Sequence, residues 1–113
     1  MPSSGEPTPA QRFLIGHTRP VTCLAFNSDG SILASGQRTS GEDDSGGPSL
    51  RLWDFATGAC IALVPAHTDG PSYLSFSHDD RLLCSVGKDK LRRTQIIVWD
   101  VSKAHLGEQP GMV

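Results

Sequence analysis

The sequence lacks the features of a membrane-spanning, secreted or strongly charged protein. No apolar run approaches the roughly 18 residues that a membrane helix needs. Residues 1–10 have no basic start and no apolar stretch of the kind found in secretory signals, so we expect a disordered lead-in. The 10 Lys and Arg and the 12 Asp and Glu give a net charge of −2, which is too balanced to favour nucleic acid or a membrane as a partner.

Cysteine is also scarce. Cys23, Cys60 and Cys84 are odd in number and widely spaced, and no C-x-x-C pair occurs. We therefore expect no disulfide framework and no zinc site, and a reduced cytosolic compartment. The sequence has no phosphate-binding glycine loop, paired catalytic carboxylates or Cys/His nucleophile set, so no cofactor and no metal are expected.

One short segment has the look of a catalytic motif. Asp44–Pro48 reads Asp-Ser-Gly-Gly-Pro, which resembles the surroundings of the nucleophile in trypsin-like serine proteases. Such an enzyme needs a histidine base and an acid that orients it, both earlier in the chain. Only 44 residues precede Ser45, and His17 is the one histidine among them. We interpret the segment as a polar loop and expect a protein that is not an enzyme.

The sequence does contain an internal repeat. Residues 16–36 align with residues 66–86 at a spacing of 50 residues, and share a His-Thr pair and two apolar runs separated by a turn. Each copy ends on a Trp-Asp pair, at Trp53-Asp54 and at Trp99-Asp100. These pairs are 46 residues apart, so the first copy is four residues longer. A repeat of this length indicates one supersecondary unit per copy.

Both copies have the pattern of short strands. Apolar and β-branched residues alternate with turn residues, and no stretch has sustained helical periodicity. Predicted strands of the first copy cover residues 21–26, 32–35, 50–53 and 60–64. Those of the second lie near residues 72–76, 82–86 and 95–99. The sequence therefore predicts an all-β fold with almost no helix.

The Gly-His start, the serine of the second strand and the terminal Trp-Asp, in units of four strands, resemble WD40 repeats over residues 11–101. The resemblance implies about two four-stranded blades, a fragment of a β-propeller. Ala34–Gln37 with the long insert after it is similar to the echinoderm microtubule-associated protein-like group. The pattern as a whole resembles a centriolar and ciliary group of WD-repeat proteins.

We expect four segments along the chain. They are the lead-in (1–10), an outer strand with the first blade (11–64), a second blade without its outer strand (65–101) and an irregular tail (102–113). Propellers close with roughly four to eight blades, so two blades are predicted to be part of a longer propeller. Alone, they would expose sheet edges and blade faces, and the isolated fragment is expected to self-associate.

The resemblance also implies a hydrogen-bonded network in each blade. The two networks would be His17–Ser35–Trp53 and His67–Ser85–Trp99. A serine hydroxyl can accept from the indole N–H and donate to the imidazole, so such a chain can be buried. The family's fourth member is an Asp in a tight turn between the second and third strands. Both turns carry inserts here, which leaves Asp43, Asp44 and Asp89 as open candidates.

The two inserts carry opposite charge. Gly41–Gly47 is acidic and Lys88–Arg93 is basic. Either both are solvated loops that pair weakly, or they form a surface that contacts partners. The candidate contact residues are Glu42, Asp43, Asp44, Lys88, Lys90, Arg92 and Arg93. Four cations without interleaved aromatics do not favour nucleic acid, and the three acids lack the alternating spacing of a calcium loop.

Together these features predict a non-enzymatic scaffold that binds protein partners. By resemblance, the partners would be tubulin, microtubules or centriolar proteins, and the location would be cytoplasmic, at the centriole or basal body of the cilium. A role in cilium assembly would follow. The alternative is a generic WD40 adaptor in another cytoplasmic complex.

Overall fold

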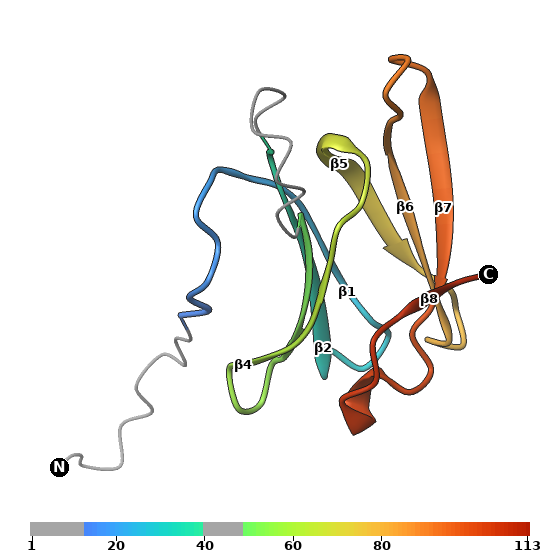
Figure 1. The fold of residues 1–113 in the computed structure, drawn as a ribbon. Coiled ribbons are helices and arrows are strands. Elements are labelled where there is room, and N and C mark those ends of the chain that lie inside the picture. Colours follow the sequence, from blue (N-terminus) through green and yellow to red (C-terminus); the bar gives the residue numbers. More distant parts are fainter. Residues whose placement is uncertain (1–12, 40–48) are drawn as a thin grey trace, which may run out of the picture.

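The computed structural model describes residues 13–39 and 49–113 and consists of two antiparallel four-stranded sheets (Figure 1). The order is β1-β2-β3-β4 in the first sheet and β5-β6-β7-β8 in the second, so each strand pairs with its neighbour in the chain. The strands are β1 (Val21–Phe26), β2 (Ile32–Gln37), β3 (Leu50–Asp54), β4 (Ala59–Val64), β5 (Thr68–Phe76), β6 (Leu82–Lys88), β7 (Thr94–Asp100) and β8 (Gly111–Met112). The predicted all-β fold of two four-stranded units is confirmed.

Local sequence explains where the strands turn. Asn27 ends β1, and its side-chain oxygen accepts a hydrogen bond from the backbone N–H of Ile32 at 3.0 Å. Gly30 has a φ of 75°, a conformation that favours glycine and closes this hairpin tightly. The carboxylate of Asp54 accepts a bond from the backbone N–H of Ala56 at 3.0 Å, which starts the turn into β4. Polar side chains that bond their own backbone thus reverse the chain.

The second sheet has an outer strand, which corrects the prediction of an incomplete blade and an irregular tail. Gly111 and Met112 form β8 and pair with Asp100 and Trp99 of β7. Between them the polar stretch forms the short 3-10 helix η1 (Ala104–Leu106) and a reversal at Gly107, where φ is 83°. The tail forms a strand because this reversal brings its last residues alongside β7.

The predicted outer strand near residues 11–15 is wrong for the part that the structure describes. Residues 13–15 have no strand conformation, and Phe13 and Ile15 are among the most exposed apolar side chains. An extended segment becomes a strand only when a sheet edge pairs with it. The predicted lead-in and the acidic insert, with Ser45, lie outside the described residues.

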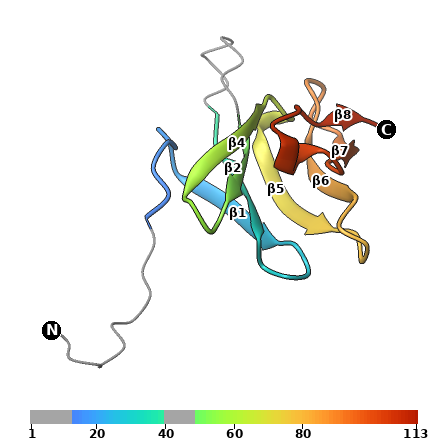
Figure 2. The same cartoon turned by 90° about the horizontal axis from the view of Figure 1, so that it is seen from below.

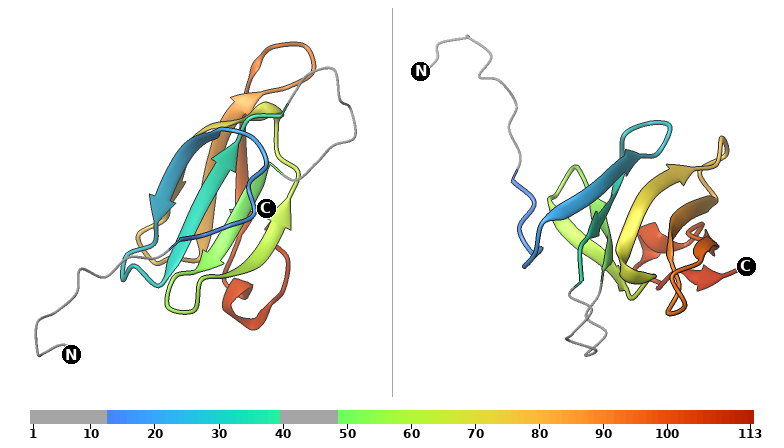
Figure 3. Two further views of the ribbon diagram at one scale, coloured as in Figure 1. Left: turned by 90° about the vertical axis from the view of Figure 1, so that its left-hand side faces the viewer. Right: turned by 90° about the horizontal axis from the view of Figure 1, so that it is seen from above.

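The two sheets pack face to face, with β5 of the second sheet lying across β1 and β2 of the first (Figures 2 and 3). Apolar side chains from both sheets form the core between them. Its buried members are Ala34, Leu50, Leu52, Ala62, Val64, Ala66, Leu74, Leu83, Trp99, Val101 and Ala104. Val101 and Ala104 come from the segment that follows β7, which closes the lower side of the core against β4.

The sheets are stacked in the same sense rather than as mirror images. Leu74 and its repeat equivalent Leu24 stand 50 residues apart. Leu74 is 4% exposed in the core, whereas Leu24 is 61% exposed on the outward face of the first sheet. Conversely, Leu50 is fully buried, whereas Ile96, at the matching place in the second sheet, is 65% exposed. The two sheets therefore face the same direction. The face of the first sheet that carries Leu50 lies against the core, and so does the opposite face of the second sheet, which carries Leu74.

Both sheets share an upper and a lower end, in the orientation of Figure 1. At the upper end, where β1 and β5 begin, the Thr22 hydroxyl donates to the carbonyl of Pro71 at 2.5 Å. At the lower end, the backbone N–H of Ser28 donates to the carboxylate of Asp80 at 2.8 Å. No helix in the described part of the chain is long and apolar enough to cross a membrane.

Candidate functional site

A short hydrogen-bonded chain crosses the first sheet. The indole N–H of Trp53 on β3 donates to the Ser35 hydroxyl oxygen on β2 at 2.8 Å. The same oxygen lies 2.5 Å from Nε2 of His17, which comes from the segment before β1. Ser35 is 2% exposed and Trp53 is equally buried, so these bonds replace bonds to water. The structure brings the three predicted residues together.

The second sheet repeats this chain. Trp99 on β7 donates to the Ser85 oxygen on β6 at 2.9 Å, and Nε2 of His67 lies 2.8 Å from that oxygen. Ser85 is fully buried. The ring of His67 lies directly over Gly87, where a Cβ would collide with the imidazole. Glycine at this position therefore makes room for the histidine.

The fourth member is a glutamine in both sheets rather than an aspartate. Nδ1 of His17 lies 2.7 Å from Oε1 of Gln37, and Nδ1 of His67 lies 3.0 Å from Oε1 of Gln95. The backbone N–H of Thr18 also donates to Oε1 of Gln37, which identifies that atom as the oxygen. The imidazole therefore donates from Nδ1 to Gln37.

Sequence reasoning missed these glutamines because they do not occupy equivalent positions in the repeat. Gln37 lies on β2, two residues after Ser35. In the second sheet that position is Gly87, and Gln95 reaches the site from β7, where it pairs with Gly87. Among the aspartate candidates, Asp89 instead accepts bonds from Arg93, and Asp43 and Asp44 lie outside the described residues.

The proton arrangement of each chain follows from its partners. Oε1 of each glutamine accepts from Nδ1–H, so in a neutral imidazole Nε2 has no proton and accepts from the serine hydroxyl. Burial lowers the pKa of His67, partly offset by the Gln95 hydrogen bond. Burial also lowers the pKa of His17, and the nearby Arg51 cation adds to this effect. Both histidines are thus held in the neutral form that the chain requires.

The basic insert forms the tip of the β6–β7 hairpin, which projects at the upper end (Figure 1). Asp89 organises the tip: its carboxylate accepts from the backbone N–H groups of Leu91 and Arg93, each at 2.9 Å, and from Nε of Arg93 at 2.8 Å. The backbone bond from Arg93 is the main cause of a lowered pKa at Asp89.

The four cations of this hairpin are not equivalent. Arg92 forms an ion pair with Asp69 at 2.5 Å, and Arg93 pairs with Asp89. Lys88 donates to the hydroxyl of Thr94 at 3.2 Å. Within the described residues, Lys90 makes no side-chain hydrogen bond or ion pair. The acidic candidates Glu42, Asp43 and Asp44 lie outside the described residues.

The described residues contain no group of three or more His, Cys, Asp or Glu side chains placed to hold a metal ion. Cys23, Cys60 and Cys84 are all free thiols. Burial raises the pKa of the Cys23 thiol.

Two four-stranded antiparallel sheets, stacked in the same sense and each crossed by a His-Ser-Trp chain, define consecutive blades of a β-propeller. The family model for the WD domain, G-beta repeat, matches residues 9–54 and 58–91. This chain belongs to the WD40 repeat family, and the predicted resemblance is confirmed.

Among curated proteins, the chain is similar to WD repeat-containing protein 90 of Xenopus tropicalis, with 46% identity over 98 residues. The match covers 86% of this chain and 5% of that protein. Centriole proteome protein 16 of Chlamydomonas reinhardtii is 39% identical over 100 residues, which cover 88% of this chain and 4% of the relative. The chain thus spans about one twentieth of the length of these relatives.

Among solved structures, the chain resembles the crystal structure of the RRP9 WD40 repeats, with a TM-score of 0.66 and 22% identity. The match covers 88% of this chain and 27% of that chain. This likeness concerns the fold alone.

The network can be tested with Ser85→Ala, which removes the shared hydroxyl and leaves the packing almost unchanged. We expect a loss of roughly 1–3 kcal/mol in the free energy of unfolding, because the Trp99 N–H and the His67 Nε2 lose a buried partner. Urea denaturation followed by tryptophan fluorescence measures the change. Ser72→Ala, which removes an exposed hydroxyl that donates to the Val86 carbonyl, is the matched control for a serine hydrogen bond open to water. Equal stability of the two variants would rule out an energetic role for the chain.

The lowered pKa values of His17 and His67 predict a pH-dependent stability. The folded state binds fewer protons than the unfolded state when the pH falls below 6.5, the ordinary histidine value. Stability is therefore fully present above this value and declines as the pH falls below it. The thermal unfolding midpoint should be lower at pH 5.5 than at pH 7.5, and His67→Gln should reduce this difference. His78→Gln, on the exposed lower hairpin, should leave it unchanged, and an equal effect of both variants would contradict the assignment.

Proposed function

We propose that this chain forms part of a non-enzymatic protein-interaction scaffold of the centriole and cilium, with a role in cilium assembly. The observation that carries the proposal is the similarity of 86% of the chain to WD repeat-containing protein 90, together with the match to centriole proteome protein 16. Cilia- and flagella-associated protein 52 of Chlamydomonas reinhardtii, which is 32% identical over 96 residues, supports the same location.

A scaffold role suits the way in which the blades are built. Their side chains are used for packing and for the buried His-Ser-Trp-Gln chains, whereas the β6–β7 hairpin projects into solvent (Figure 1). A rigid sheet can thus present a short loop in a fixed position, which lowers the entropic cost of binding. In this proposal His17, Ser35, Trp53, His67, Ser85 and Trp99 have a structural role.

The contact residues that we propose are in the two inserts. Lys88, Lys90, Arg92 and Arg93 on the β6–β7 hairpin would meet an acidic partner, such as tubulin or a centriolar protein, and Glu42, Asp43 and Asp44 would contribute from the first insert. A generic adaptor in another cytoplasmic complex would use the same hairpins, so location separates the two functions.

We further propose that the isolated chain self-associates through its outward faces. Leu24 and Phe26 are 61% and 52% exposed on the first sheet, and Tyr73 and Ile96 are 61% and 65% exposed on the second. Neighbouring apolar side chains of this kind favour association. Sedimentation velocity should show a sedimentation coefficient that rises with concentration, and Leu24→Ser should reduce the rise. A concentration-independent monomer would contradict this proposal.

The function is tested by the location of the full-length gene product that contains this chain, tagged with a fluorescent protein in ciliated cells. We expect centriolar and basal-body foci, and fewer or shorter cilia after depletion. Trp53→Ala together with Trp99→Ala should weaken the foci, because both blades lose their buried chains, while a Phe13→Ala control at an exposed site should not. Diffuse cytosolic signal with normal cilia would favour the generic adaptor.

A further inference from the structure

Charged side chains are sorted between the two ends of the molecule. The described residues include nine Lys and Arg, of which six lie at the upper end: Arg19, Arg38, Lys88, Lys90, Arg92 and Arg93. They also include eight Asp and Glu, of which six lie at the lower end: Asp29, Asp54, Asp79, Asp80, Asp100 and Glu108. Within the described residues, the charges are therefore divided between a basic end and an acidic end.

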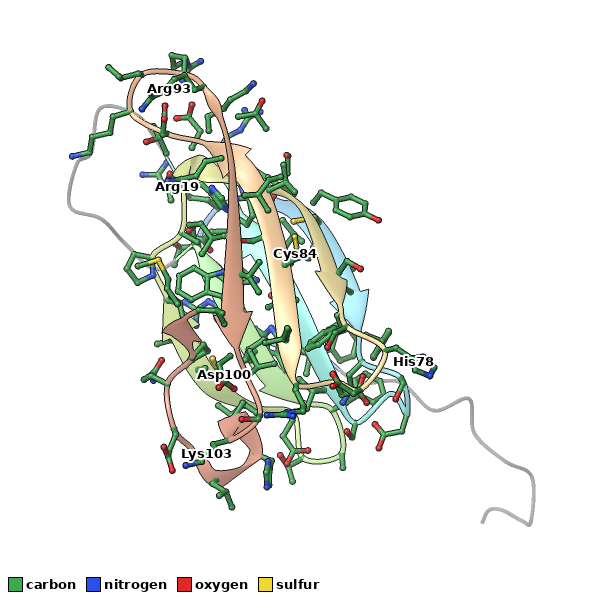
Figure 4. All side chains as sticks on the ribbon, turned by 90° about the vertical axis from the view of Figure 1, so that its right-hand side faces the viewer. Arg19, His78, Cys84, Arg93, Asp100 and Lys103 are labelled. Carbon is green, nitrogen blue, oxygen red and sulfur yellow. The ribbon has the colours of Figure 1, made fainter. Side chains whose placement is uncertain are left out.

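The cations of the basic end come from both blades and form one surface. Arg38 follows β2, and its backbone N–H donates to the carbonyl of Pro20 at 2.9 Å, which places it beside Arg19. On its other side, the Arg38 backbone lies against Gly70 of the second blade. The next residue back, Asp69, pairs with Arg92 of the hairpin. The surface thus runs from the start of β1 across to the hairpin tip, where Figure 4 places Arg93.

The cations that are free to bind differ from those that hold the hairpin. Arg92 and Arg93 are each paired with a carboxylate, and these are the two acids of the upper end in the described part of the chain. Arg19, Arg38 and Lys90 are exposed and make no side-chain ion pair within the described residues. Among the described residues, no carboxylate neutralises these three cations, at least one of which lies in each blade.

We propose that this basic end is the docking surface for a short acidic segment of a partner polypeptide, rich in Asp or Glu. The proposal deepens the scaffold function proposed above and rests on it. Opposite charge favours such a partner and increases its rate of association.

The side chains around this surface support the same choice. Proteins that bind single-stranded nucleic acid combine cations with aromatic side chains on which bases stack. In the described part of the chain, the hairpin and the turns at Arg19 and Arg38 contain no exposed aromatic residue. The single tyrosine of the sequence, Tyr73, is exposed on the face of the second sheet, where it pairs with Val86, outside these turns. Phe26 and Phe55 lie instead at the lower end, in edge-to-face contact with each other.

The test is the binding of fluorescein-labelled decaglutamate to the full chain, followed by fluorescence anisotropy. We expect saturable binding that weakens as the salt concentration rises from about 50 mM to about 300 mM, because salt screens exposed charges. Arg38→Glu together with Lys90→Glu should weaken binding by about tenfold or more. The matched control, Arg81→Glu together with Lys103→Glu, changes the net charge by the same amount at the lower end and should weaken binding by less than about twofold.

Each outcome decides the proposal. Equal weakening by both double variants would show that net charge alone attracts the peptide, and this would overturn the docking surface. Absence of decaglutamate binding would do the same. Tighter binding of a labelled ten-nucleotide oligothymidylate, lost in the Arg38/Lys90 variant, would assign the surface to nucleic acid instead. If peptide binding fails while the full-length protein still forms centriolar foci, the scaffold function stands and the docking surface does not.

Discussion

The structure depends on the close approach of the two sheets at Gly36. A Cβ at this position would collide with the ring of Pro71 and with the sulfur of Cys23. One residue earlier in β5, Gly70 passes so close to the carbonyl of Gln37 that it too has no room for a side chain, and its φ of 85° also favours glycine. Gly36 thus makes room for the side chains of Pro71 and Cys23, and Gly70 allows its backbone to approach that of Gln37. The apolar faces of β2 and β5 meet, and the core closes, because of this contact.

The same contact cannot be repeated by a second copy of the chain. In the repeat, Val86 stands where the first blade has Gly36, and Tyr73 stands in place of Cys23. On the opposite face, Pro20 occupies the place of Gly70. The outward-facing equivalents of Gly36, Cys23 and Gly70 are therefore all larger residues. Identical copies would be overpacked at this spacing, so self-association through these faces requires a wider spacing, and a neighbour that fits closely has to differ in sequence.

Most of the fold could be predicted because its causes are local. Strand β1 was predicted with its observed bounds, since a β-branched and apolar run is followed directly by Asn27 and Gly30. Strand β8 was not predicted, because two residues carry no strand pattern and form a strand only where η1 and Gly107 return them to β7. The glutamines escaped prediction for a similar reason. In the second blade, Gln95 has the role that Gln37 has in the first, but it comes from β7, where it pairs with Gly87. A repeat alignment places Gln37 opposite Gly87 and therefore does not find Gln95.

The buried chain and the basic hairpin are connected through the same two strands. β6 carries Ser85 and continues three residues further to Lys88, while β7 begins at Thr94, directly before Gln95. The bonds that His67 makes to Ser85 and Gln95 therefore tie the two stems of the hairpin together close to its tip. Lys88 and Thr94 form the next bond outward, and Asp89 then fixes the tip itself. A continuous series of bonds leads from the core to the exposed cations, so a neutral His67 helps to hold the hairpin in one position.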